Sequence, residues 1–214
     1  MQTVLIEQIA VGPMANFSYL IIDPATKKAA YVDPGFDVQK VLQTAQKMGV
    51  TIEKILVTHT HFDHIQQLDQ AFEALKVPVY VSGIEVGALE EMGVPAHSLA
   101  DGDTLSVGGL SVKCLLTPGH TSGELCYQVG NHLITGDVLF VDGCGRVDLP
   151  GSDPEKMFYT LKMLAVLPDE TIIYPGHDYG PTPTDTIGNQ KKTNPYLAAA
   201  LKGEQTFFNV RGVF

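Results

Sequence analysis

The segment 58–64, Thr-His-Thr-His-Phe-Asp-His, constrains this chain more than any other, because four side chains that can bind a metal ion lie within it. Residues 52–57, just before it, include the short apolar run of a buried strand. Residues 65–75, just after it, place apolar side chains on one face of a helix. The motif therefore lies where a strand gives way to a helix, and in open α/β sheets ligands bind at that carboxyl end of a strand.

The spacing within the motif indicates two metal positions. His59 and His61 are two residues apart, so in an extended turn their rings converge on one point. Asp63 and His64 follow on the next bend and project elsewhere, and imidazole and carboxylate are ligands for zinc, iron or manganese. Ordinary alternatives stay open: an isolated histidine belongs to the surface or the core more often than to a metal, and Asp63 with Gln66 would form a helix capping box.

Side chains of the same types recur after three later strand-like runs. His120 follows residues 110–116, Asp137 follows residues 133–135, and His177 follows residues 171–174. Together with the H-x-H-x-D-H motif, this order resembles the metallo-β-lactamase superfamily over essentially the whole chain. The resemblance implies an α/β (α+β) fold, the four-layer αββα sandwich in which two mixed sheets face each other with helices outside.

The resemblance also implies the ligands of two divalent metal ions, zinc first, with iron or manganese as alternatives. The first metal would take His59, His61 and His120, and the second would take Asp63, His64 and His177. Asp137 would bridge the two metals beside a water or hydroxide, whose pKa falls to roughly 7 on zinc. Asp63 would also have a catalytic part, because it would accept a hydrogen bond from this nucleophile and aim it.

Two further segments are similar to the glyoxalase II-like hydroxyacylglutathione hydrolases, which implies cleavage of a thiolester. These are the run from Asp137 through Gly143-Cys144-Gly145-Arg146, and Pro175-Gly176-His177-Asp178-Tyr179. Many β-lactamases of this fold lack the bridging carboxylate that Asp137 supplies here. The family implies that Arg146 and Tyr179 contact the glutathione part of a small-molecule thiolester, while a surface ion pair is the ordinary alternative for Arg146.

Other functions remain open on the same residues. Persulfide dioxygenases share these segments and hold one ferrous ion through the equivalents of His59, His120 and Asp137, a two-His-one-carboxylate arrangement. Metal storage or a binding module is the non-enzymatic alternative. The helical C-terminal domain that grips glutathione in typical glyoxalase II enzymes has no counterpart, so one domain is expected over 1–214 and glutathione recognition is left open.

Composition limits the partners. The chain has 24 acidic and 14 basic residues, a net charge of −10, which disfavours nucleic acid but permits an anionic small substrate beside metal cations. It has no run of about eighteen apolar residues and no basic leader at Met1, so no membrane partner and a cytoplasmic location are expected. Three cysteines do not indicate a disulfide framework, and Cys144 alone lies near the expected metals.

The remaining patterns predict the other elements and two histidines that are not ligands. Strands are expected at 4–9, 17–22, 29–32, 79–81 and in a hairpin of 124–129 with 132–135, and helices at 38–48, from the motif to Lys76, at 83–92, 154–167 and 194–202. Pro181, Pro183 and Gly188 are expected to break most of the tail. His97 is expected in a polar loop and His132 at the hairpin's edge. Asp33, in Asp33-Pro34-Gly35, either supports the site or is ordinary turn chemistry.

Overall fold

The computed structural model describes residues 3–210, so the expectation about Met1 lies outside the described residues. One sheet contains β1 (Leu5–Val11), β2 (Asn16–Asp23), β3 (Lys28–Val32), β4 (Thr51–Leu56), β5 (Val79–Ser82) and β6 (Ala96–Leu99), in that order. The second contains β7 (Thr104–Val107), β8 (Leu110–Leu116), β9 (Leu125–Val129), β10 (His132–Gly136), β13 (Ile172–Pro175) and β14 (Asp185–Thr186). Its order is β14-β13-β10-β9-β8-β7, and β11 (Leu139–Phe140) pairs with β12 (Gly143–Cys144).

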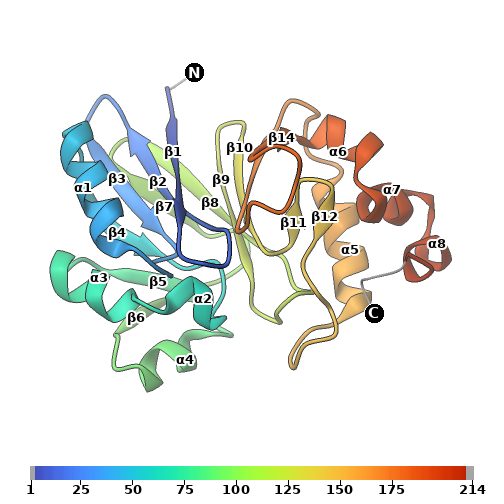
Figure 1. The fold of residues 1–214 in the computed structure, drawn as a ribbon, viewed down its shortest axis with the longest axis horizontal. Helices are drawn as coiled ribbons and strands as arrows, with labels where there is room; N and C mark the ends of the chain where they lie inside the picture. The colour runs from blue at the N-terminus through green and yellow to red at the C-terminus, as the bar shows by residue number, and fades with distance from the viewer. Residues whose placement is uncertain (1–2, 211–214) are drawn as a thin grey trace.

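Helices cover the outer faces of both sheets (Figure 1). The first sheet carries α1 (Val38–Met48), α2 (Phe62–Ile65), α3 (Leu68–Leu75) and α4 (Val86–Glu91). The second carries α5 (Pro154–Leu164), α6 (Ile187–Thr193), α7 (Pro195–Lys202) and α8 (Glu204–Phe208). Within residues 3–210, no helix has the length and apolar character needed to cross a membrane.

The side chains of β2 show why the layers form, because all eight residues are buried although successive side chains point to opposite faces. Leu20 and Ile22 belong to the apolar core shared with α1 and α3. Tyr19 and Ile21 belong to the core between the two sheets. A third core joins the second sheet to α5, α7 and α8, so three cores separate four layers and the predicted αββα sandwich is confirmed.

The direction of the strands brings the expected ligands together. Strand β9 pairs antiparallel with both β8 and β10, and β13 pairs parallel with β10. Strands β8, β10 and β13 therefore run the same way, and their carboxyl ends meet at one edge of the second sheet. The motif after β4 adjoins this edge, because the Leu125 N–H donates to the Thr58 carbonyl at 2.9 Å.

Most predicted elements are confirmed. The opening strands β1, β2 and β3 pair antiparallel, as expected. The predicted hairpin is also correct, with Val129 paired to His132 across its turn. The helix expected near the end of the chain is α7, and the Asn194 side chain caps it by accepting from the N–H groups of Tyr196 and Leu197.

The continuous helix predicted from the motif to Lys76 is wrong, because the chain forms α2 and α3 with a break at Gln67. The Gln67 N–H donates to the Pro34 carbonyl at 3.1 Å, and its Oε1 accepts from the Val38 N–H at 3.0 Å, at the start of α1. The capping role considered for Asp63 is also wrong, since His61 is the N-cap residue of α2 and no side chain caps this helix.

Three other expectations differ from the structure. The helix predicted at 83–92 begins only at Val86, because Ser82 Oγ accepts from the Ile84 N–H and holds a turn there. The expected loop around His97 is the edge strand β6, whose polar, exposed side chains hide the strand pattern. Gly188 lies inside α6 rather than breaking the tail, and the short α8 was not predicted.

Candidate metal centre

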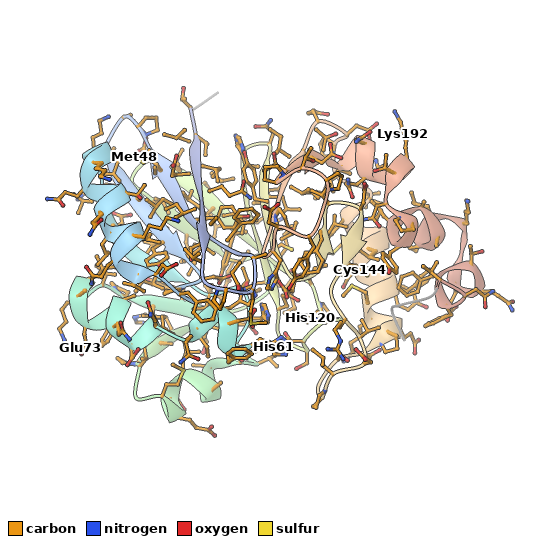
Figure 2. The ribbon with its side chains drawn as sticks, in the orientation of Figure 1. Met48, His61, Glu73, His120, Cys144 and Lys192 are labelled. Atoms are coloured by element: carbon orange, nitrogen blue, oxygen red, sulfur yellow. The ribbon has the colours of Figure 1, made fainter. Side chains whose placement is uncertain are left out.

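Seven side chains predicted as ligands come together where the two sheets meet. His59, His61, Asp63 and His64 follow β4, while His120, Asp137 and His177 follow β8, β10 and β13. Figure 2 shows His61 and His120 close together in the seam between the two halves of the ribbon. All seven are buried except His61, which is partly exposed.

Among residues 3–210, three groups of three side chains have the geometry of metal sites, and two of them are the groups predicted from the sequence. The third, His59, His64 and Asp137, connects these two. We name the first trio His59, His61 and His120, and the second trio Asp63, His64 and His177. In each trio the candidate ligand atoms lie within 4.8 Å of one another. His61 Nδ1 lies 2.8 Å from His120 Nε2, and His177 Nε2 lies 3.3 Å from Asp63 Oδ2. The members of each trio are the side chains that the resemblance assigned to the first and to the second metal.

Asp137 lies between the trios. Its Oδ2 is 3.5 Å from His120 Nε2 in the first trio and 3.3 Å from His177 Nε2 in the second. Its Oδ1 is 3.3 Å from His64 Nε2. One carboxylate therefore faces ligand atoms of both trios, which is the position that a bridging ligand requires.

Hydrogen bonds on the far side of the rings fix which nitrogen faces the centre. His120 Nδ1 lies 2.8 Å from the Arg146 carbonyl and His177 Nδ1 lies 3.0 Å from the Met14 carbonyl. A carbonyl only accepts, so Nδ1 carries a proton in both rings and Nε2 is the atom that faces the centre. His64 Nδ1 is held in the same way by Asp33 Oδ2 at 3.0 Å.

Two buried atoms show that the centre suits a metal. Among the described residues, His59 Nε2 and Asp137 Oδ1 have no hydrogen-bond partner. Such an atom costs about 1–3 kcal/mol when it is left unsatisfied, and a metal ion would satisfy both. Burial is the main reason why the pKa of His59 lies well below its usual value, and repulsion from His64 adds to it. The ring is therefore in the neutral form that binds metals.

Asp63 remains ionised in its buried position. Burial acts to raise its pKa, but a hydrogen bond from His177, the charge of His64 and a hydrogen bond from Asn16 outweigh it and lower the pKa to about 2. The Asn16 Nδ2 donates to Asp63 Oδ2 at 2.9 Å. Asp63 is therefore a carboxylate at neutral pH, which is the form that a ligand or a hydrogen-bond acceptor needs.

Three buried polar residues around the ligands were missed or left open by the sequence analysis. Glu124 Oε1 accepts from the Asp137 N–H at 2.6 Å and so holds the backbone of the bridging position. Asn16 holds Asp63, and Asp33 holds His64, which settles the open alternative for Asp33 in favour of support for the site. A polar residue beside an apolar strand was the only sequence signal for Glu124, and it does not identify a partner.

A cavity of about 560 Å³ opens onto the centre. Ligands of both trios line it, together with Asp137, Cys144, Arg146 and Tyr179. Arg146 is exposed and forms a two-pronged ion pair with Asp148, with Nε to Oδ1 at 2.8 Å and Nη2 to Oδ2 at 2.9 Å. The Tyr179 ring stacks on His177, with centroids 4.6 Å apart. Both predicted substrate residues therefore lie at the cavity.

Within residues 3–210, the other candidate groups lie outside the clusters that could hold a metal. Burial raises the pKa of Cys144 to about 12, so its thiol is protonated at neutral pH, and among the described residues it joins no group that could hold a metal. His132 Nδ1 lies 2.9 Å from the Tyr174 hydroxyl, and His97 stacks on Tyr80 with centroids 5.1 Å apart. Neither histidine belongs to a ligand group in the described part of the chain.

The four-layer fold is that of a superfamily of metal-dependent hydrolases, and the cluster of histidine and aspartate side chains suits that class. Residues 11–177 match the family Lactamase_B, the metallo-β-lactamase superfamily, and the chain belongs to it. The match confirms the resemblance at the level of the superfamily.

Individual relatives agree with this assignment. The chain is 32% identical to the probable polyketide biosynthesis zinc-dependent hydrolase BaeB of Bacillus velezensis, over 92% of this chain and 87% of BaeB. The crystal structure of ETHE1 from Myxococcus xanthus superposes with a TM-score of 0.85 at 30% identity, covering 97% of this chain and 92% of that one. TTHA1623 in a di-iron-bound form superposes with a TM-score of 0.74 at 32% identity, covering 89% and 99%.

Proposed function

We propose that this chain hydrolyses small-molecule thiolesters, with one divalent metal ion in each trio and Asp137 between them. The observation that carries the proposal is the Asp137 carboxylate, which lies 3.5 Å from His120 Nε2 on one side and 3.3 Å from His64 Nε2 on the other. Bound metal ions would lower the pKa of a water molecule toward neutrality and polarise the substrate carbonyl. The resemblance to glyoxalase II-like enzymes supports the same reaction.

The residues of the chain would position the reacting groups. Asp63 would accept a hydrogen bond from the attacking water and aim it, because Asn16 holds this carboxylate in place and its low pKa keeps it ionised. Asp137 would keep the two trios in register, because Glu124 holds its backbone N–H at 2.6 Å. Cys144 would take no part as a nucleophile, since its thiol has a pKa of about 12.

The leaving group favours a thiolester over a lactam. Apart from the predicted ligands, the titratable side chains that line the cavity are Cys144, Arg146 and Tyr179. Burial, more than any other cause, raises the pKa of the Tyr179 hydroxyl, so Tyr179 is a poor proton donor. The Cys144 thiol is a poor donor for the same reason. An amine leaving group needs a proton, whereas a thiol has a pKa of about 8.5 and departs as a thiolate without one.

The substrate would be a thiolester with an anionic tail, with glutathione thiolesters among the candidates. Arg146 would bind a carboxylate of this tail, but the Asp148 carboxylate already occupies its guanidinium and must be displaced or shared. Tyr179 would line the path beside it, with its ring against His177. Zinc is the first candidate for both metals because the relative BaeB is named a zinc-dependent hydrolase, and iron is the alternative that TTHA1623 supports.

The test is metal analysis of the purified chain together with hydrolysis of S-lactoylglutathione. We expect two metal ions per chain, loss of activity on chelation, and product acid labelled by heavy-oxygen water without a trapped acyl-protein. A covalent acyl adduct on Cys144, or two metals without hydrolysis of any thiolester, would refute the proposal.

A second candidate is a mononuclear iron persulfide dioxygenase. His59, His120 and Asp137, the ligands that this activity would need, lie together, and the structural similarity to ETHE1 gives this candidate some support. One iron per chain and oxygen uptake with glutathione persulfide, instead of thiolester hydrolysis, would favour it.

A further inference from the structure

Glu85 is a buried carboxylate at the metal centre to which no role has been assigned. It follows β5, precedes α4 and is 8% exposed. It is not a member of either trio. Its neighbours are two threonines from the loops that carry the first trio.

The carboxylate of Glu85 joins these two loops. Its Oε2 accepts from the Thr60 N–H at 2.6 Å and from the Thr60 hydroxyl at 2.7 Å. Its Oε1 accepts from the Thr121 hydroxyl. Thr60 lies between His59 and His61, and Thr121 directly follows His120, so one side chain ties together the segments that carry all three ligands.

His61 depends on this tie more than the other ligands do. The rings of His120, His177 and His64 are each held through Nδ1 by an acceptor. Within residues 3–210, no hydrogen bond engages Nε2 of His61, whose Nδ1 faces His120. The position of its ring therefore follows from its backbone, which the two bonds from Thr60 to Glu85 hold.

Gly123 makes room for the close approach between Glu85 and the loop after His120. A Cβ atom on Gly123 would lie 2.6 Å from Glu85 Cγ and 2.9 Å from Ile84 Cβ. Only glycine lets the loop after His120 approach the turn at residues 82–85 so closely. The same turn is held by the Ile84 N–H, which donates to Ser82 Oγ at 3.1 Å.

We propose that Glu85 is a positioning residue that sets the distance between the His59–His61 loop and His120, and therefore the metal affinity of the first trio alone. The second trio has its own support in Asp33 and Asn16, which Glu85 does not contact. The proposal rests on the metal assignment of the proposed function but not on thiolester hydrolysis.

The experiment measures each trio separately by titrating metal-free protein with zinc against a chelator. Asp63→Ala leaves only the first trio complete, and His61→Ala leaves only the second. Adding Glu85→Ala should weaken zinc binding about 10- to 100-fold in the Asp63→Ala background, the usual effect of losing a group that orients a ligand. The same change in the His61→Ala background should leave zinc binding unaltered.

Three further variants make the result specific. Glu85→Gln should restore most of the affinity, because its amide oxygen can accept from Thr60 and its NH₂ group can donate to the Thr121 hydroxyl. Thr121→Val removes one contact and should give a smaller loss; it also replaces Glu85→Ala if that variant does not fold. Glu90→Ala, an exposed position on α4, is the matched control and should have no effect.

The outcomes separate this inference from the proposed function. If the unaltered chain binds no metal in the trios, the metal assignment fails. If it binds two ions but Glu85→Ala weakens both trios equally, or weakens neither, the metal assignment stands and the positioning role of Glu85 is refuted. If Thr121→Val is used instead, an unchanged zinc affinity of the first trio refutes the positioning role of Glu85 in the same way.

Discussion

Replacing Asp33 with asparagine tests how the second trio is held. Asp33 Oδ1 accepts from the Thr58 N–H at 2.7 Å, and Oδ2 accepts from the Thr58 hydroxyl at 2.7 Å and from His64 Nδ1 at 3.0 Å. The residue has φ of 54°, a left-handed conformation that asparagine tolerates as well as aspartate does. The substitution therefore changes hydrogen bonding without changing the preferred backbone or the volume.

An asparagine at this position cannot satisfy both of its N–H neighbours. Its oxygen can face the Thr58 N–H or His64 Nδ1–H, and its NH₂ group then opposes the other donor. The backbone N–H of Thr58 cannot move its proton, whereas an imidazole can. Burial acts to lower the pKa of His64, but Asp137 and Asp33 raise it well above its usual value, so without a metal the ring carries a proton on both nitrogens. We expect the amide oxygen to stay with Thr58, so that the ring, on giving up one proton, keeps the other on Nε2, the atom that faces the second trio.

The magnitude follows from the bond that is lost. To bind a metal through Nε2, His64 must hold its one remaining proton on Nδ1, where the partner is now a donor. A buried hydrogen bond to a charged group is worth about 1.5–3 kcal/mol, which corresponds to about a 10- to 150-fold loss of metal affinity. The loss should be confined to the second trio, because Asp33 contacts no ring of the first trio directly.

Zinc titration in the His61→Ala background reports the second trio alone, and nitrogen-15 NMR of the imidazole rings reports the His64 tautomer. Asp37→Asn is the matched control, because Asp37 is exposed and, within residues 3–210, its carboxylate accepts only from the Gly12 N–H at 2.9 Å. Unchanged zinc affinity with His64 still protonated at Nδ1 would refute the reasoning and make Asp33 an ordinary turn residue.

Three other changes test the remaining assignments. Asp63→Ala should reduce the metal content from two ions to one per chain; full content and an unchanged rate would show that Asp63 is not a ligand. Arg146→Met should raise KM for an anionic thiolester about 2- to 5-fold, the scale of an exposed ion contact, while KM for a neutral thiolester stays the same. If the variant and the unaltered chain have the same KM for the anionic thiolester as well, Arg146 is a surface ion pair with Asp148. Cys144→Ala should keep most of the hydrolytic activity, and iodoacetamide at about pH 8 should barely label Cys144, whose pKa of about 12 leaves little thiolate.

The candidate ligands could be predicted from the sequence because each lies in the segment that follows a strand. A run of β-type residues followed by His or Asp is a local pattern, and parallel strands bring such positions to one edge. This pattern and the resemblance to the superfamily were enough to assign candidate ligands to the segments after β4, β8, β10 and β13. The same holds for α1, whose apolar spacing and terminal Gly49 mark both its face and its end.

The groups that orient the ligands were not predictable, because their partners are distant in sequence. Glu85 and Glu124 are acidic residues beside apolar strands. Exposed acidic residues are common at the ends of strands too, so their position in the sequence does not show that they are buried. Only the fold shows that Glu85 lies against Thr121 and that Glu124 lies against the backbone of Asp137. The break at Gln67 was hidden for the same reason, since its N–H is taken by Pro34 from another element.

Two different strands of the first sheet lead to the supports of the two trios. Asp33 directly follows β3 and holds His64, while Glu85 lies between β5 and α4 and holds the loops of the first trio. Asp137 approaches from the second sheet, and a Cβ on Gly176 would lie 2.3 Å from its Oδ1, so the strand that carries His177 can pass only with glycine there. Each group of ligands is therefore fixed by its own buried carboxylate, and Asp137 is the point at which the two halves of the centre are brought into register.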